Sequence, residues 1–211
     1  MARAFEDVFG IGDAFGGIAM PGRTDAWILS GAASAHGISS APPLLARFRG
    51  AYLAHLAHEL HEPSPGKRKG VMPGVRALLD RLSTHDDTYL ALLTGNCEEG
   101  ARLKLEYFDL WRYFRSGAYG DEALDRNALL PAALARIESC GGPAASASDV
   151  VIVGDTPFDI DVALAGGAHS IAVATGGHGV EELTAAGADA VFETLADTNA
   201  VLDAIRGLKT A

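Results

Sequence analysis

The segment Val150–Asp159 restricts the fold more than any other stretch of the chain. It begins with four β-branched apolar residues, which are typical of a strand buried on both faces of a parallel sheet. Gly154 then permits a turn, and Asp155 follows just past the end of the strand, where open α/β sheets bind ligands. Thr156 and Pro157 are residues preferred at the N-cap and first position of a helix. The segment therefore predicts a parallel α/β sheet with Asp155 at its ligand-binding edge.

Asp155 and Asp159 are the candidate metal ligands. One lies at a strand end and the other in the first turn of the following helix, so both carboxylates can meet one hard cation such as Mg²⁺. A structural role also fits, because Asp159 completes a Thr-x-x-Asp capping box with Thr156, and Asp155 is a common turn residue. The Gly-Asp-x-x-x-Asp motif alone leaves both alternatives open.

The pattern of predicted elements changes once along the chain. Residues 2–62 show only helical apolar spacing, and the run His61–Gly70 has the composition of a linker. Helices and strands alternate afterwards, which favours a parallel sheet with right-handed crossovers. The predicted strands are Tyr89–Leu93, Ser116–Tyr119, Val150–Val153, Ser170–Ala174 and Ala190–Phe192. We expect a helical domain over residues 1–65 and an α/β domain over residues 66–211.

Composition limits the classes of partner. A net charge of −10 argues against nucleic acid or an anionic membrane as the main partner. The two cysteines, Cys97 and Cys140, predict neither a disulfide framework nor a zinc cluster and are typical of a reducing cytosol. No apolar run reaches the length of a membrane span, and acidic residues near Met1 argue against a signal peptide. We expect a cytoplasmic protein whose oligomeric state the sequence leaves open.

Two further loops carry chemistry. A predicted strand ends in Thr94, Gly95 and Asn96 just before a helix, where a hydroxyl and backbone N–H groups can bind a phosphate oxygen. The alternative is a plain strand-to-helix turn with Asn96 as the N-cap. Arg126 then closes the acidic loop Gly120–Arg126 and can pair with a buried carboxylate or a phosphate. Its alternative is a solvated surface ion pair.

In chain order, the Thr94 loop, the Arg126 loop and the Gly-Asp-x-x-x-Asp motif resemble those of the haloacid-dehalogenase-like (HAD) hydrolase superfamily, particularly its phosphoglycolate-phosphatase-like branch. The resemblance covers nearly the whole chain. It implies a Rossmann-type parallel core with an α-helical cap, and a Mg²⁺-dependent enzyme that hydrolyses the phosphate monoester of a small phosphorylated metabolite through an aspartyl-phosphate. The segment Gly22–Asp25 and the helices up to Glu62 are similar to the cap of such proteins.

The resemblance also implies a role for each motif residue. Arg126 matches the basic residue that neutralises the phosphoryl group, although the family more commonly has Lys followed by Pro; Lys104 is the alternative cation. The implied site comprises the catalytic residues Thr94 and Arg126, the phosphate-binding residues Thr94, Gly95, Asn96 and Arg126, and the Mg²⁺ ligands Asp155 and Asp159.

The family's nucleophile is missing from the sequence. It is the first Asp of an Asp-x-Asp motif that ends the first core strand, and no apolar run followed by Asp-x-Asp precedes Thr94. The segment Asp159–Asp161 has this spacing but lies in a predicted helix, where side chains two positions apart diverge by about 200°. We expect the first core strand to be absent, a gap between the strands that end at Thr94 and Asp155, and an inactive chain.

The cause of this absence is open, since a misassigned start and a real loss both fit. Two other functions also remain open. One is a non-catalytic protein that binds phosphate and Mg²⁺, and the other is a HAD hydrolase that cleaves a C–halogen or C–P bond.

Overall fold

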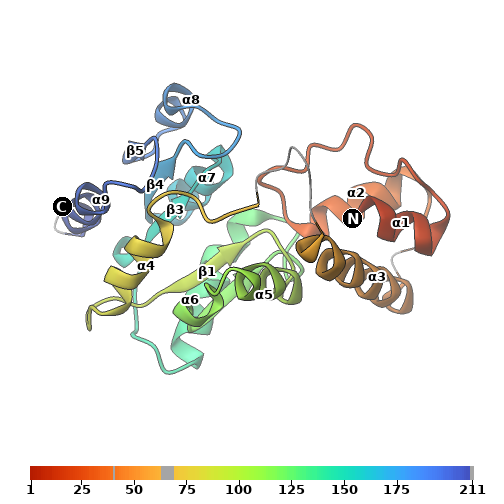
Figure 1. Ribbon diagram of the computed structural model, residues 1–211, viewed down its shortest axis with the longest axis horizontal. Coiled ribbons are helices and arrows are strands. Elements are labelled where there is room, and N and C mark those ends of the chain that lie inside the picture. The colour runs from red at the N-terminus through yellow and green to blue at the C-terminus, as the bar shows by residue number, and fades with distance from the viewer. Residues whose placement is uncertain (40, 63–68, 210–211) are drawn as a thin grey trace.

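The structure is a computed structural model that describes residues 1–39, 41–62 and 69–209 (Figure 1). The predicted boundary between residues 65 and 66, and most of the predicted linker, lie outside these ranges. The helices α1–α3 gather at one end of the molecule in Figure 1, and we call them the helical unit. Their bounds are Ala2–Phe9 for α1, Asp25–Ala35 for α2 and Pro42–His61 for α3.

Aromatic packing holds the helical unit together. Phe5 on α1 is fully buried, and its ring centroid lies 5.9 Å from that of Phe48 on α3 and 5.3 Å from that of Phe15. Phe48 stacks in turn on Tyr52 one helical turn later. The apolar spacing that predicted these helices therefore marks the face that each helix buries.

The remaining elements form the α/β unit, and their order confirms the predicted alternation. Every strand pair is parallel. The strands are β1 (Ala91–Thr94), β2 (Ser116–Tyr119), β3 (Val151–Gly154), β4 (His169–Val173) and β5 (Ala190–Phe192). The α-helices are α4 (Val75–Ser83), α5 (Glu98–Tyr107), α6 (Leu129–Ser139), α7 (Pro157–Gly166), α8 (Val180–Ala185) and α9 (Thr198–Leu208). Short 3₁₀ helices are η1 (Trp111–Tyr113), η2 (Arg126–Ala128) and η3 (Ala147–Asp149).

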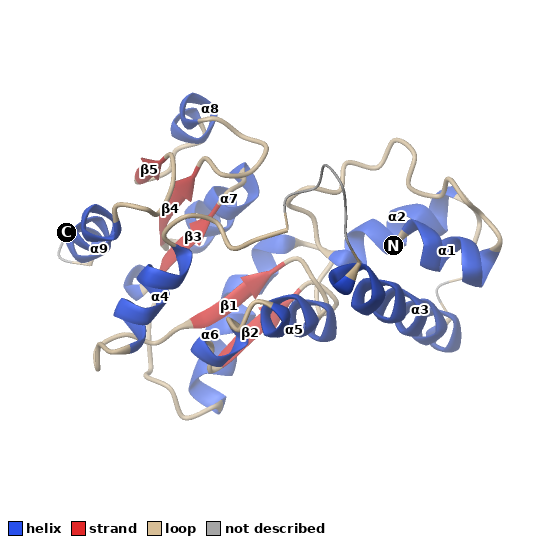
Figure 2. Ribbon diagram, in the orientation of Figure 1, coloured by secondary structure: helices blue, strands red, loops and turns tan. Residues whose placement is uncertain are grey.

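The strands form two separate fragments, β1–β2 and β3–β4–β5 (Figure 2). Within the described ranges no ladder joins β1 to β3. Helix α6 packs against β1, β2 and α7, and so connects the two fragments. Val153 in β3 is 41% exposed, although strands in the middle of a parallel sheet are normally covered on both faces. These fragments agree with the predicted fold class, in which the first core strand is absent.

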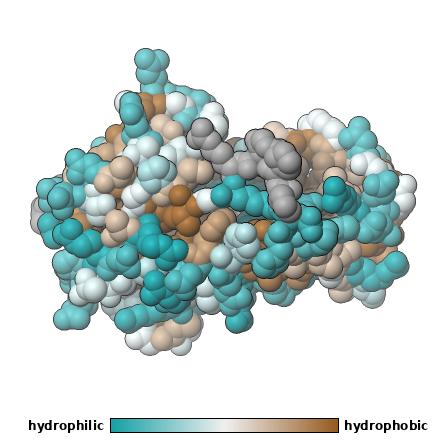
Figure 3. All heavy atoms as spheres, in the orientation of Figure 1, coloured by the Kyte–Doolittle hydropathy of each residue, from teal (hydrophilic) through white to brown (hydrophobic). Residues whose placement is uncertain are grey.

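Hydrophobic surface is exposed beside this interruption. Figure 3 shows brown surface near the middle of the visible face, over the part of the α/β unit where β1 and the segment before α4 lie in Figure 1. Met72 in that segment is 40% exposed. In the part of the chain that the structure describes, no helix is both long enough and apolar enough to cross a membrane.

The loops after β1 and β2 touch each other at the carboxyl edge of their strands. Gly120 donates its backbone N–H to the carbonyl of Asn96 at 2.8 Å. A Cβ atom at Gly120 would lie only 1.8 Å from the carbonyl oxygen of Gly95, so this approach requires glycine. The contact fixes the candidate phosphate loop against the neighbouring strand end.

Candidate functional site

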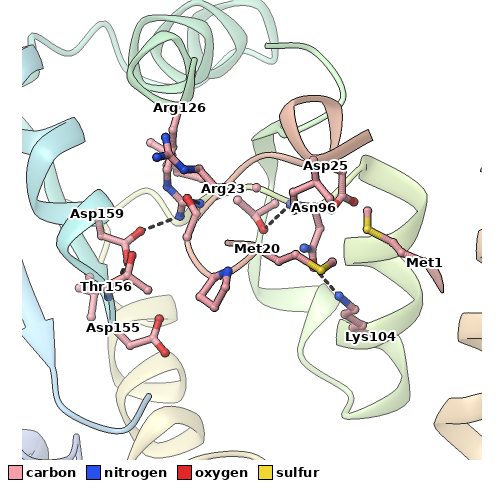
Figure 4. A pocket seen from close by; sticks show the side chains of 18 of the residues that line it. Met1, Met20, Arg23, Asp25, Asn96, Lys104, Arg126, Asp155, Thr156 and Asp159 are labelled. Carbon is pink, nitrogen blue, oxygen red and sulfur yellow. Dashed lines mark hydrogen bonds and ion pairs between the residues drawn. The ribbon is translucent and has the colours of Figure 1, made fainter. Parts of the chain in front are cut away.

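A cavity of about 620 Å³ opens at the carboxyl ends of β1 and β3 (Figure 4). Its walls come from the loop before α2, the loop after β1, and the turn between β3 and α7. Figure 4 shows Asp155, Asp159 and Arg126 toward one side, and Asp25 and Lys104 on the other. The sequence-predicted residues that line it are Thr94, Gly95, Asn96, Lys104, Arg126, Asp155 and Asp159.

The turn between β3 and α7 forms around Asp159. The N–H and hydroxyl of Thr156 donate to Oδ2 of Asp159 at 3.0 and 2.9 Å, which completes the capping box that the sequence allowed. Asp159 is only 7% exposed. A Cβ atom at Gly154 would lie 2.2 Å from Cγ of Asp159, so the strand end must be glycine for this carboxylate to fit.

Arg126 is the cation that faces Asp159. Its Nη2 lies 2.7 Å from Oδ1 of Asp159, and both side chains are largely buried. Its Nη1 donates to the carbonyl of Gly22 in the helical unit at 2.9 Å. The alternative of a solvated surface pair is therefore wrong for Arg126. Its Nε is buried and has no hydrogen-bond partner within the described part of the chain.

Asp155 differs from Asp159 in its partners. Its carboxylate lines the cavity, and no side chain among the described residues donates a hydrogen bond to it. Burial raises the pKa of Asp155 above its ordinary value, and the nearby charge of Asp159 raises it further. A Cβ atom at Gly176 would lie 2.3 Å from Oδ2 of Asp155, so the loop after β4 passes close to one oxygen of this otherwise exposed residue.

The loop after β1 places a second cation on the opposite side. Nζ of Lys104 on α5 donates to Oδ1 of Asn96 at 2.7 Å, and burial lowers the pKa of Lys104. The alternative role of Asn96, as N-cap, is wrong, because α5 begins at Glu98 and its N-cap is Cys97. The backbone N–H of Asn96 instead donates to Oγ1 of Thr94 at 3.2 Å.

Asp25 is a half-buried carboxylate of the cavity that the sequence analysis did not single out. Its Oδ2 accepts the backbone N–H of Cys97 at 2.8 Å, and its own N–H donates to the carbonyl of Gly95 at 2.6 Å. Burial is the main cause that raises the pKa of Asp25. Both partners lie about 70 residues away in the chain, so no local pattern could identify this contact.

Arg23 and Thr24, which precede Asp25, anchor the helical unit to the same cavity. Arg23 stacks between Trp27 and Phe158, with its guanidinium carbon 4.5 and 4.4 Å from the two ring centroids. Thr24 caps α2, because its hydroxyl accepts the N–H of Trp27 at 3.1 Å. The segment Gly22–Asp25 therefore docks onto the candidate site through side chains and backbone together.

The donor set is compatible with Mg²⁺ through Asp155. Mg²⁺ sites commonly use one or two carboxylates completed by water and phosphate oxygens. Asp155 offers a carboxylate to which no side chain in the described ranges donates, whereas Arg126 and Thr156 already occupy the oxygens of Asp159. No group of three or more His, Cys, Asp or Glu side chains is arranged to hold a metal ion, as far as the structure describes the chain.

Comparison with known proteins adds a family match and a shared fold. Residues 125–198 match a family model described as HAD-hydrolase-like. No match was found among curated proteins.

Three solved structures are similar over most of the chain. The match to a hydrolase from Pseudomonas syringae covers 96% of this chain and 92% of the hydrolase, with 20% identity and a TM-score of 0.63. A predicted phosphoglycolate phosphatase from Haemophilus somnus 129PT gives 16% identity, coverages of 95% and 88%, and a TM-score of 0.63. A predicted phosphatase from Clostridium acetobutylicum gives 22% identity, coverages of 81% and 74%, and a TM-score of 0.59. At these identities the likeness shows a common fold.

Proposed function

Because the chain has the fold of the HAD-like hydrolases and matches their family model over residues 125–198, as its motifs predicted, we propose that it is a Mg²⁺-dependent phosphatase of a small phosphorylated metabolite. The observation that carries the proposal is the charge arrangement of one cavity. The unoccupied Asp155 carboxylate and the buried Arg126–Asp159 pair line the same cavity as Thr94 and Lys104.

Each side chain has a defined part in this proposal. The Thr94 hydroxyl binds a phosphate oxygen, and Asp155 holds the metal. Arg126 positions Asp159, because its two terminal nitrogens already bond Asp159 and Gly22. Lys104 is bonded only to Asn96 among the described residues and has further N–H donors for the substrate. When bound, Mg²⁺ would neutralise charge on the phosphoryl oxygens.

The nucleophile requires an additional strand. Since β1 and β3 each present an edge without a strand partner in the described ranges, we propose that a parallel strand lies between them and ends in the family's Asp-x-Asp. Met1 lines the cavity at the carboxyl edge, which is where such a strand would end if the polypeptide continued upstream of Met1. This supports an upstream segment of the same polypeptide as the occupant.

The proposed strand supplies the two missing chemical steps. Its first carboxylate attacks phosphorus and forms an aspartyl-phosphate, while its second acid gives a proton to the leaving alcohol. Water then hydrolyses the aspartyl-phosphate and releases inorganic phosphate. Loss of the nucleophile in a covalent mechanism costs on the order of 10⁶ in rate, so the 211-residue chain should be inactive.

The test compares the 211-residue chain with a form extended by the in-frame upstream codons, using hydrolysis of p-nitrophenyl phosphate with and without Mg²⁺. We expect activity only in the extended form with Mg²⁺. Asp155→Asn in the extended form should lower kcat/KM by on the order of a hundredfold or more. The matched control is Asp86→Asn, which should leave the rate unchanged because Asp86 is exposed and is not part of the cavity lining.

Two outcomes would contradict the proposal. Mg²⁺-dependent turnover by the 211-residue chain would place the nucleophile within it. An in-frame stop codon directly upstream of Met1, together with calorimetric binding of inorganic phosphate and Mg²⁺ but no turnover, would favour the non-catalytic binding protein.

A further inference from the structure

Phe158 is an aromatic side chain in the first turn of α7 that the proposed chemistry does not use. It directly precedes Asp159 in the chain, and its ring contacts the helical unit. A Cβ atom at Gly22 would lie 2.2 Å from the ring atom Cδ2 of Phe158, and Gly22 has a φ of +74°. The backbone conformation and the closeness of this ring therefore both require glycine at position 22.

The first turn of α7 holds Gly22 from two directions. The ring of Phe158 lies against its backbone, and Arg126 donates from Nη1 to its carbonyl at 2.9 Å. The other terminal nitrogen of Arg126 lies 2.7 Å from Oδ1 of Asp159, the residue that follows Phe158. Both contacts depend on one helical turn, so the position of Gly22 is tied to that of the Asp159 carboxylate.

Arg23 extends this contact with its side chain. Its guanidinium carbon lies 4.4 Å from the ring centroid of Phe158 and 4.5 Å from that of Trp27, so the cation is held between one aromatic face from each unit. Its Nε is buried and has no hydrogen-bond partner in the described ranges. Two aromatic faces therefore stabilise the guanidinium. Leucine in place of Phe158 would keep apolar bulk and lose one of these faces.

The helical unit supplies one wall of the candidate cavity next to this contact. Residues 20–23 line the cavity from the helical unit, whereas Thr94, the proposed phosphate ligand, lines it from the α/β unit. The placement of the helical unit therefore decides the space that is left for the part of a substrate beyond its phosphate.

We propose that Phe158 is a positioning residue, which through Gly22 and Arg23 holds the helical unit against the cavity and so sets the affinity for the part of the substrate beyond the phosphate. The inference deepens the phosphatase function and rests on it for the substrate. It requires an aromatic face at position 158, and not apolar bulk alone.

Hydrogen exchange in the 211-residue chain, followed by NMR, measures the docking without any substrate. The backbone N–H of Asp25 donates to the carbonyl of Gly95 at 2.6 Å, and that of Ala26 donates to the carbonyl of Gly120 at 2.9 Å. Both amides therefore bond from the helical unit to the α/β unit. Phe158→Leu should speed their exchange by roughly tenfold, as expected for the loss of one partly desolvated cation–π contact. Phe158→Tyr keeps the aromatic face and should leave both rates near those of the unmodified chain.

Two references separate docking from general stability. The amides of β4, whose ladders lie wholly in the α/β unit, should exchange equally in all variants. Leu164→Ala is the matched control, because Leu164 is 59% exposed on the same helix, and it should not change the exchange of Asp25 or Ala26. Equal acceleration of the β4 amides, or equal effects of Phe158→Leu and Phe158→Tyr, would overturn the inference.

Kinetics of the extended form test the consequence for the substrate. Phe158→Leu should raise KM for p-nitrophenyl phosphate severalfold and leave kcat nearly unchanged, because binding of the alcohol part is weakened equally in the ground and transition states. Phe158→Tyr should keep the original KM. The inhibition constant of inorganic phosphate should stay the same in both variants, since phosphate has no alcohol part. A loss of kcat at unchanged KM, or a matching rise in the inhibition constant, would contradict the positioning role.

The two tests distinguish this inference from the proposed function. Faster exchange of Asp25 and Ala26 in Phe158→Leu, with no activity in the extended form, would remove the phosphatase and leave Phe158 as the residue that docks the helical unit. Activity in the extended form, with exchange unchanged by Phe158→Leu, would keep the phosphatase and remove the role of Phe158.

Discussion

Asp155 and Asp159 are the same kind of side chain, four positions apart, in opposite electrostatic environments. Asp159 accepts hydrogen bonds from Arg126 and from two groups of Thr156, and Asp155 accepts none from a side chain in the described ranges. The motif identified both residues but could not separate them, because the group that separates them, Arg126, lies 33 positions away in the sequence. Local patterns predict positions at a strand end, and tertiary contacts decide which carboxylate stays available.

Asp25→Asn should stabilise the protein at neutral pH. The pKa of Asp25 is raised in the folded state by burial, so ionisation of this group costs stability as the pH rises above its ordinary value of 3.8. The variant should therefore equal the unmodified chain below about pH 4 and exceed its unfolding free energy at about pH 7. Urea unfolding at the two pH values measures this, and a variant that is less stable at pH 7 would contradict the assigned cause.

The two cysteines should react at very different rates. Burial raises the pKa of Cys97 to about 11. Cys140 is exposed. Ellman's reagent at about pH 8 should therefore modify one thiol rapidly and the second only on unfolding in urea, because so little Cys97 is thiolate at that pH. Rapid modification of two thiols in the folded chain would contradict this burial.

At the scale of elements, apolar spacing predicted the bounds of the strands to within about two residues. The strand Ser116–Tyr119 has its predicted bounds. The contacts between loops were beyond this kind of inference. Gly120 carries no side-chain signal in the sequence, yet the closeness of the β1 and β2 loops depends on it.

Gly120→Ala should separate these two loops and destabilise the protein. The added methyl would meet the Gly95 backbone, which cannot move away as a flexible side chain can, so we expect a cost of about 1–3 kcal/mol. The matched control is Gly50→Ala within α3, where nothing lies within 4 Å of an added Cβ and the helix should gain about 0.5–1 kcal/mol. Chemical denaturation compares the two, and equal effects would show that the loop contact is unimportant.

At the scale of the whole molecule, the interrupted sheet is the dominant feature. Strand edges without partners are templates for association with another chain, and Val153 adds exposed apolar surface beside one of them. The sequence predicted this interruption from a missing motif. It could not predict how α6 would keep the two fragments together, since that depends on packing against β1, β2 and α7.

Val153→Lys should reduce self-association of the chain, because a charge beside an open strand edge opposes pairing with another strand. Val180→Lys is the matched control, since Val180 is 38% exposed on α8 and Val153 is 41% exposed on β3. Sedimentation velocity over a range of concentrations should show less oligomer for the first variant only. Equal behaviour of both variants would mean that general hydrophobicity, and not the strand edge, causes association.

The two bonds of Arg126 connect the helical unit to the proposed metal site. One terminal nitrogen bonds the Gly22 carbonyl of the helical unit and the other bonds Asp159. If the proposed ion also drew on the charge of Asp159, it would compete with Arg126 for this carboxylate. By reciprocity, a ligand that strengthened the bond between Arg126 and Asp159 through the helical unit would lower the affinity for the ion by the same factor. Under the proposed function, the affinity for the ion would therefore depend on how the helical unit contacts Arg126.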